Sequence, residues 1–290
     1  MIHEIQAKTL LATVRGKDPV FGLRYNMNLY RGCEHQCIYC DSRSECYQIE
    51  NFNDILVKIN AIELLKKELP RKRIKGTIGT GSMSDPYIPA ERRYNLTGQA
   101  LQVIAQYGFP VHINTKSDLI LKDLEVLCQI NQVHASVCFT ITTTDDALAR
   151  KIEPGAPSPT RRFKAMEALA SRGIQVGVSM MPVLPFIEDN PENINRIVEQ
   201  TAEHGGRFII PWLGMSLRDR QRAYYYEQLD RLFPGLRQKY ENSFGERYEC
   251  PANHQQALGQ HFEMICKQHG IATKITPYQF KVEGIQLPLF

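Results

Sequence analysis

The stretch Cys33–Cys40, CEHQCIYC, lies near the start of this chain and predicts both its chemistry and its fold. Its thiols follow the frame Cys-x3-Cys-x2-Cys, and eight cysteines in 290 residues seldom produce that frame by chance. Iron–sulfur clusters normally take four thiolates. A four-iron cube held only by Cys33, Cys37 and Cys40 would leave one iron open to an outside ligand, as catalytic zinc sites keep an open position.

A zinc knuckle is the alternative for the same thiols, because His35 or Cys46 can supply a fourth ligand. The remaining cysteines are expected to be buried thiols, since a reducing cytosol disfavours disulfides. They are Cys128, Cys138, Cys250 and Cys266.

Composition indicates a soluble globular enzyme, with 43% hydrophobic and 23% charged residues. The chain has no run of about 18 apolar residues, so no membrane span is expected. The first ten residues, MIHEIQAKTL, lack the apolar core of a signal peptide, which predicts a cytoplasmic protein. A net charge of +4 permits a polyanionic partner without requiring one.

Strand-like and helix-like segments alternate along the chain and predict an α/β fold, an incomplete (β/α)6 TIM-like barrel. The expected strands are Arg24–Tyr30, Ile74–Thr80, Val111–Thr115, Val133–Thr142, Ile174–Met180 and Phe208–Trp212. The expected helices are Asn53–Leu69, Ala90–Tyr107, Asp118–Ile130, Ser158–Arg172, Pro191–His204 and Gln255–His269.

The expected organisation has four parts. Residues 1–23 form an irregular lead-in, and residues 24–215 form the partial barrel. Residues 216–283 form a mostly helical C-terminal extension, and residues 284–290 form a flexible tail.

Two loops at the carboxyl ends of strands carry polar groups, and barrel chemistry sits at those ends. The stretch Gly76–Tyr87, GTIGTGSMSDPY, has glycines that let the backbone approach a ligand, and Gly81 is a candidate cofactor contact. Its hydroxyls and Asp85 can take an ammonium group. The stretch Asn114–Ser117 places Lys116 where it can hold a carboxylate.

CEHQCIYC, with the aromatic Tyr39 before its third cysteine, resembles the signature of the radical S-adenosylmethionine (radical SAM) superfamily. The resemblance implies a 4Fe-4S cluster that binds S-adenosyl-L-methionine (SAM) at its open iron. One electron then splits SAM and releases a 5′-deoxyadenosyl radical. It also implies that Tyr39 lies near the adenine and that a reductant such as flavodoxin or ferredoxin serves the cluster.

Further motifs between Arg24 and Met181 are similar to the spore photoproduct lyase branch, whose members are often labelled DNA repair photolyase-like. These motifs are GTGSMSDPY, NTKSDL, Thr140–Asp145 and Glu153–Arg162. The resemblance implies that Ser84 and Lys116 hold the amino acid end of SAM. Thr140 and Arg162 become candidates for its ribose and carboxylate side.

The chain departs from that branch at two positions. The lyases carry a hydrogen-donating cysteine before a Thr-Ser-Asp, where this chain has Ser82 and Met83 before Ser84, and a tyrosine where it has Asp41. A serine O–H bond is too strong to replace a thiol S–H bond as hydrogen donor. Cys138 is the substitute in principle, although a buried strand cysteine is the expected reading.

The C-terminal residues resemble the short peptide by which bacterial replication and repair proteins bind the sliding clamp. They are Gln286, Leu287, Pro288, Leu289 and Phe290. An extended tail can place its apolar side chains in a cleft while the glutamine makes directional hydrogen bonds. The alternative is a hydrophobic tail folded onto the barrel or onto a dimer partner.

Three functions follow. The first is a radical SAM enzyme acting on DNA, in lesion repair with lyase-like chemistry. The second is the same SAM chemistry on RNA, protein or a metabolite. The third is a non-catalytic metal-binding module of the replication machinery.

Overall fold

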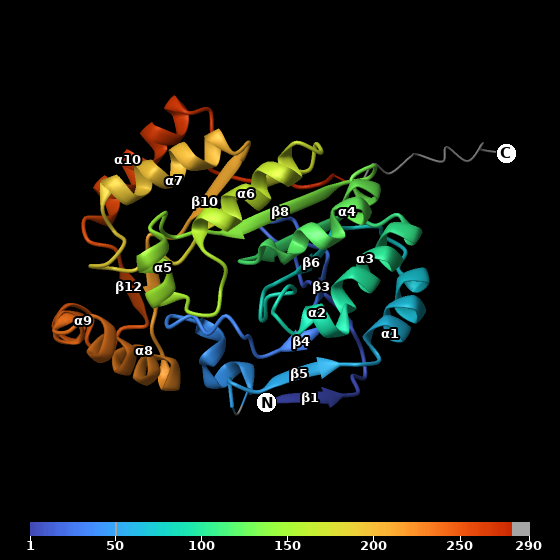
Figure 1. Cartoon of the computed structure of the whole chain (residues 1–290), viewed down its shortest axis with the longest axis horizontal. Coiled ribbons are helices and arrows are strands. Elements are labelled where there is room, and N and C mark those ends of the chain that lie inside the picture. Colours follow the sequence, from blue (N-terminus) through green and yellow to red (C-terminus); the bar gives the residue numbers. More distant parts are fainter. Residues whose placement is uncertain (50, 280–290) are drawn as a thin grey trace.

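The computed structural model describes residues 1–49 and 51–279. Its centre is a seven-stranded sheet with the order β10-β9-β8-β7-β6-β3-β2 (Figure 1). The strands from β3 to β10 pair in parallel, and β2 pairs antiparallel with β3. Their bounds are β2 Leu11–Thr13, β3 Tyr25–Met27, β6 Ile78–Thr80, β7 Val111–Thr115, β8 Ala135–Thr140, β9 Gln175–Met180 and β10 Phe208–Pro211.

The inner strands are short apolar runs because both faces of the sheet are covered. All residues of β8 from Ala135 to Phe139 are buried, for example. Helices follow the sheet in an arc (Figure 1). They bury their apolar stripes in one core, except for the helix that ends at Ile152, which packs in a second cluster. They are α1 Ala61–Glu68, α2 Glu91–Tyr94, α3 Leu96–Tyr107, α4 Leu124–Ile130, α5 Asp146–Ile152, α6 Pro159–Ala170 and α7 Pro191–Glu203.

The predicted α/β class is confirmed, with parallel strands in the expected chain order. Strands β10 and β2 form the two edges of the sheet, and within the described residues they do not pair with each other. The barrel is therefore incomplete, and an open side remains between its two edge strands.

The prediction for the start of the chain was wrong in two places. The lead-in contains β2 and also β1 (Ile2–Ile5), and the expected helix Asn53–Leu69 starts as strand β5 (Ile55–Lys58). Strand β5 lies between β1 and β4 (Tyr30–Arg31) in a small side sheet. The side chains of β1 are mostly exposed, so the sequence has no apolar alternation there to reveal a strand.

Two predicted helices are interrupted, and a further helix was missed. Asn95, with φ of 50°, separates α2 from α3, and a 3-10 turn over Asp118–Asp123 precedes α4. Helix α5 was not predicted. Its N-terminus is capped by Asp145, whose Oδ1 accepts hydrogen bonds from the backbone N–H groups of Ala147 (2.7 Å) and Leu148 (3.1 Å).

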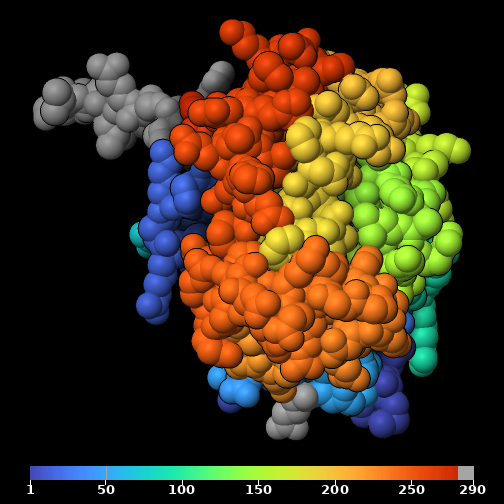
Figure 2. Space-filling view, turned by 90° about the vertical axis from the view of Figure 1, so that its left-hand side faces the viewer, coloured from blue at the N-terminus to red at the C-terminus, as the bar shows by residue number. Residues whose placement is uncertain are grey.

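The C-terminal extension contains α8 Asp219–Leu232, α9 Leu236–Phe244 and α10 Gln255–Gln268. It also has an antiparallel pair that was not predicted, β11 Gly214–Ser216 with β12 Glu249–Pro251. Figure 2 shows α8 and α9 (orange) as one lobe, with the segment after β12 above it. Aromatic side chains of this lobe, including Tyr225 and Tyr240, share a core with Cys37 and Tyr39. The extension therefore supports the cysteine loop.

No helix of the described residues is long and apolar enough to cross a membrane. The tail residues Gln286 to Phe290 lie outside the described residues.

Candidate active site

A cavity of about 370 Å³ opens at the carboxyl ends of the parallel strands. All but one of the residues predicted from the sequence to hold the cluster or SAM line it: Cys33, Cys37, Tyr39, Cys40, Gly81, Ser84, Lys116 and Thr140. The weaker candidate Arg162 does not line the cavity. It is 1% exposed and its Nη1 donates to the carbonyl oxygen of Thr140 at 2.8 Å.

The cysteine loop is held in shape by its own backbone and by neighbouring segments. Gly32 has φ of 79°, and a Cβ there would lie 2.3 Å from the carbonyl oxygen of Asp54, so only glycine fits. The Gln36 side chain donates to the Cys33 carbonyl oxygen at 2.9 Å. The backbone N–H of Ile38 donates to the carbonyl oxygen of Ile152 at 2.9 Å.

The thiols of Cys33, Cys37 and Cys40 are free of disulfides and suited to bind iron. Burial raises the pKa of all of them, to about 12 for Cys37, while the nearby Lys116 ammonium acts to lower the pKa of Cys37 and Cys40. The thiolate is the form that binds metal. Metal coordination has to supply the stabilisation of the thiolate that burial removes, and the Lys116 ammonium assists it.

The zinc-knuckle alternative finds one of its two candidate fourth ligands already engaged. A zinc site needs its ligands within about 2.0–2.3 Å of one point, and the described residues contain no group of three His, Cys, Asp or Glu arranged to hold one ion. In a cube, each thiolate binds its own iron. His35, a zinc candidate, already uses Nδ1 with the Gly155 carbonyl oxygen (3.1 Å) and Nε2 with Asp85 (3.2 Å).

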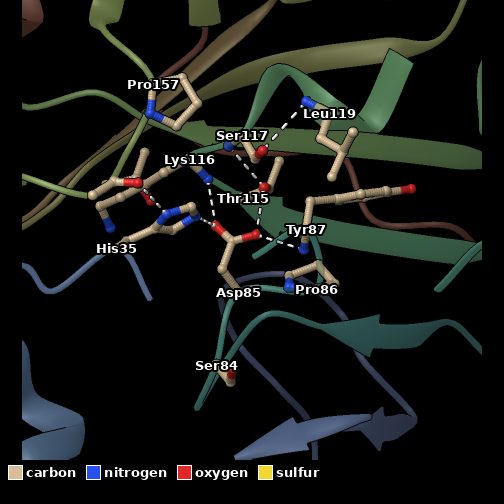
Figure 3. Close-up of polar contacts among 12 residues, drawn as sticks. His35, Ser84, Asp85, Pro86, Tyr87, Thr115, Lys116, Ser117, Leu119 and Pro157 are labelled. Carbon is tan, nitrogen blue, oxygen red and sulfur yellow. Dashed lines mark hydrogen bonds and ion pairs between the residues drawn. The ribbon is translucent and has the colours of Figure 1, made fainter. Parts of the chain in front are cut away.

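Asp85 connects the loops beneath the cavity (Figure 3). Its Oδ1 accepts hydrogen bonds from the Thr115 hydroxyl (2.7 Å) and the Tyr87 backbone N–H (2.8 Å). Its Oδ2 accepts from the backbone N–H of Lys116 (2.6 Å) and pairs with His35. Burial acts to raise the pKa of Asp85, but His35 and these hydrogen bonds hold it at about 2. Because both oxygens are occupied, the expectation that Asp85 takes an ammonium is not supported.

The loop after β6 approaches its neighbours closely. Gly81 has φ of 97°, and a Cβ there would lie 2.1 Å from the Asn114 carbonyl oxygen. The Ser84 hydroxyl donates to the Gly32 carbonyl oxygen at 2.6 Å. Gly81 and Ser84 therefore join this loop to β7 and to the cysteine loop, and the oxygen of Ser84 keeps lone pairs for a donor.

A buried carboxylate, Glu153, organises the opposite wall and was not assigned a role from the sequence. Its oxygens accept the Tyr39 hydroxyl, pair with Arg162 Nη2 at 2.5 Å and lie 3.9 Å from Lys116 Nζ. Burial acts to raise the pKa of Glu153, but Arg162 and Lys116 outweigh it and lower that pKa. Glu153 thus holds the candidate adenine contact and the candidate carboxylate contact in one network.

Asp41 joins the cysteine loop to the C-terminal extension. Its carboxylate pairs with Arg218 (2.6 Å) and accepts hydrogen bonds from the hydroxyls of Tyr47 (3.0 Å) and Ser216 (3.2 Å). The sequence showed Asp41 only as a departure from the lyase pattern. Its partners are separated from it by up to 177 positions, so no local pattern reveals them.

The cavity wall offers no free thiol as hydrogen donor: of the described residues lining it, the cysteines are the three of the cluster frame. Cys138 is fully buried, packs against Phe208 and Ile275, and does not line the cavity, as expected for a core thiol. Trp212 was also missed. It lines the cavity just after β10, and the strand-end rule that indicated Lys116 applies equally to it.

Residues 27–201, more than half of the chain, match the family model described as the Radical SAM superfamily. The chain belongs to the radical SAM superfamily. Its cofactors are a 4Fe-4S cluster and S-adenosyl-L-methionine, which this family uses.

Two relatives and a solved structure illustrate the similarity. "Uncharacterized protein Rv2578c" of Mycobacterium tuberculosis is 28% identical over 296 residues, covering 99% of this chain and 86% of its own. "Radical SAM Nalpha-GlyT isomerase" of Pseudomonas phage M6 is 23% identical over 178 residues, covering 61% of this chain and 36% of its own. Spore photoproduct lyase complexed with dinucleoside spore photoproduct superposes with a TM-score of 0.71 at 16% identity, over 93% of this chain and 81% of the lyase. The chain therefore has a spore photoproduct lyase-like fold.

Proposed function

We propose that this protein is a radical SAM enzyme that modifies DNA, in lesion repair with lyase-like chemistry. The observation that carries the proposal is one cavity in which three unpaired thiols face Lys116 and Thr140. A 4Fe-4S cluster held by Cys33, Cys37 and Cys40 would supply the electron for reductive cleavage of SAM.

The side chains around the cavity have distinct tasks. Lys116, half-buried in the cavity wall, presents a positive charge for the SAM carboxylate. The Ser84 oxygen accepts a hydrogen bond from the SAM amino group, and the Thr140 hydroxyl binds the ribose. Tyr39 presents its ring to the adenine while its hydroxyl is bound to Glu153. Arg162 acts from behind the wall, on Glu153 and on the Thr140 backbone.

DNA is favoured as substrate by several features. The motifs of the lyase branch span the barrel, and the fold resembles a lyase solved with a dinucleoside photoproduct. The clamp-like tail adds a route to DNA. We propose a cytoplasmic protein that receives its electron from a flavodoxin or a ferredoxin.

An isomerisation of RNA, protein or a metabolite is the second candidate. The lack of a free thiol among the described cavity residues favours it. In an isomerisation, the hydrogen atom abstracted from the substrate would be returned from 5′-deoxyadenosine to the rearranged substrate radical, so the chain need not donate one. The relative named as an isomerase is consistent with this route.

Anaerobic reconstitution tests the proposal. The protein is reduced in the presence of SAM, with ultraviolet-irradiated DNA, undamaged DNA or RNA, and the nucleosides and 5′-deoxyadenosine are analysed. Altered nucleosides from irradiated DNA alone support lesion repair. SAM cleavage without any change in DNA favours the second candidate. A colourless protein that ignores SAM would be a binding module.

We also propose that the tail residues Gln286, Leu287, Pro288, Leu289 and Phe290 bind the bacterial sliding clamp. A chain lacking these residues should lose binding to purified clamp and keep SAM cleavage. Equal clamp binding with and without the tail would remove this partner.

A further inference from the structure

A groove of about 860 Å³ lies beside the open side of the barrel. It is lined by Ile210 and Pro211 of edge strand β10, by residues between 16 and 24 that link β2 to β3, and by residues 273–279. The link from β2 to β3 and residues 273–279 touch, since a Cβ on Gly22 would lie 2.5 Å from the Pro277 side chain. They lie side by side at the left of Figure 2.

The groove is positively charged. Lys17 and Lys274 line it and are exposed, and Arg24 lines it half-buried. Of the described residues in its wall, the carboxylate is Asp18, whose oxygens accept the backbone N–H groups of Val20 (3.0 Å) and Leu23 (3.0 Å). Asp18 therefore accepts hydrogen bonds from its own loop and does not neutralise the cations of the groove.

Two of the segments that line the groove, the link from β2 to β3 and the end of β10, also place aromatic rings in the cavity of the candidate active site. Phe21 lies between Val20 and Gly22 of the groove, and Trp212 directly follows Pro211. Phe21 is held by stacking on His112, with ring centroids 4.4 Å apart. The basic groove and the cavity thus adjoin at two rings.

Trp212 is fixed in position but uncovered. Its backbone N–H donates to the Met180 carbonyl oxygen (3.0 Å), and its carbonyl oxygen accepts the N–H of Val183 (3.0 Å). Trp212 is nevertheless 39% exposed to solvent. A rigid backbone with an exposed indole leaves a flat apolar face available for a ligand.

We propose that single-stranded DNA occupies these two adjoining hollows, which extends the proposed DNA function. The strand's phosphates lie along Lys17, Arg24 and Lys274, and one unpaired base stacks on Trp212 in the cavity. Proteins that bind single strands combine a cationic groove with aromatic rings, because every base has a flat face. A base inside a duplex cannot reach a concave cavity unless it leaves the stack, and that costs least in a damaged or unpaired site.

The binding test uses reconstituted holoenzyme and a fluorescein-labelled oligodeoxythymidylate of roughly 12 nucleotides, within the range of known single-strand sites. Anisotropy reports the dissociation constant without requiring chemistry. Trp212→Ala should weaken binding about 5- to 150-fold, the range expected for one stacked base. Met264→Ala, at a residue 48% exposed on α10, is the matched control and should leave the affinity unchanged.

The charge test varies salt. Each phosphate contact on a single strand contributes about 0.7 to the slope of log affinity against log salt. The double variant Lys17→Ala and Lys274→Ala should therefore reduce the slope by about 1.4. A control pair on the exposed surfaces of α1 and α6, Lys66→Ala with Lys164→Ala, should not change it.

The outcomes separate this inference from the proposed function. Trp212 is the only tryptophan, so quenching of its emission by the oligonucleotide supports stacking. Normal DNA turnover together with unchanged oligonucleotide binding in the Trp212 and lysine variants would overturn the assignment of the groove as the DNA-binding site. The proposed function would then still stand. Tighter binding of the matched RNA would overturn DNA as the occupant. SAM cleavage without oligonucleotide binding would overturn both DNA claims and leave the radical SAM assignment intact.

Discussion

His35 Nε2 and Asp85 Oδ2 lie 3.2 Å apart, in a pair whose side chains are 2% and 7% exposed. The pair joins the cysteine loop to the loop after β6, and Asp85 continues the connection to Lys116 through a backbone hydrogen bond. One buried carboxylate thereby connects the cysteine loop to the segment that carries Lys116.

Asp85→Asn should loosen this connection. The asparagine amide has only one acceptor oxygen. Its NH2 group would face N–H or O–H groups that now donate hydrogen bonds to Asp85, so those buried groups would lose their acceptor. We expect a loss of about 1–3 kcal/mol in the free energy of unfolding and weaker SAM binding. Thermal unfolding and spectroscopic SAM titration measure the two effects. Asp230→Asn, at a surface pair with Arg237, should change neither; an equal effect in both variants would contradict the role of Asp85.

Glu153→Gln should remove the counter-ion of the buried Arg162 and of the half-buried Lys116. Arg162 would remain 1% exposed without its partner, which is expected to cost about 3–5 kcal/mol of stability. Lys116 would also lose an anionic neighbour, and SAM affinity should fall. The control is Glu125→Gln, whose pair with Arg172 is solvent-exposed and should contribute little to stability. Stability equal to that of the control would show that Glu153 is not needed to hold the network.

Cys37→Ala should abolish cluster assembly and with it the formation of 5′-deoxyadenosine, because two thiolates remain in the frame. Iron content and the visible absorption of the reconstituted protein provide the measurement. Cys128→Ala, at a half-buried thiol on α4, should retain both. Continued production of 5′-deoxyadenosine by the Cys37 variant would show that the site assignment is wrong.

Glu188 should make stability depend on pH. Burial raises its pKa from the ordinary 4.5 to about 8, while its hydrogen bonds with the Thr142 hydroxyl and the Leu184 N–H act to lower it. Between these pKa values the folded state binds more protons than the unfolded state. Its contribution is thus complete below about pH 4.5 and is lost as the pH rises to about 8, by at most about 1.4 kcal/mol per pH unit.

Glu188→Gln removes this titration and keeps an acceptor for Thr142. Urea unfolding near pH 5 and near pH 8 should show a smaller decrease for this variant than for the unchanged chain. Glu192→Gln, at a side chain 77% exposed, is the control and should behave like the unchanged chain. Parallel pH dependence in all three proteins would place the titrating group elsewhere.

Local patterns predicted much of the molecule. The alternation of strands and helices was correct for the parallel sheet because each unit has its own apolar periodicity. The cysteine spacing and the strand-end loops indicated residues that all line one cavity. Two errors fell where a pattern is shared or absent: β5 has apolar residues that also fit a helix, and no residue of β1 is buried.

The sequence by itself determined the family, the cofactors and the set of side chains at the strand ends, because these depend on short spacings along the chain. Only the tertiary structure decided which groups support them. Glu153 lies 114 positions from Tyr39, and Asp85 lies 50 positions from His35. Such partners meet because parallel strands bring their carboxyl ends to one edge of the sheet, and burial then requires each charge to find a counter-charge or a hydrogen bond.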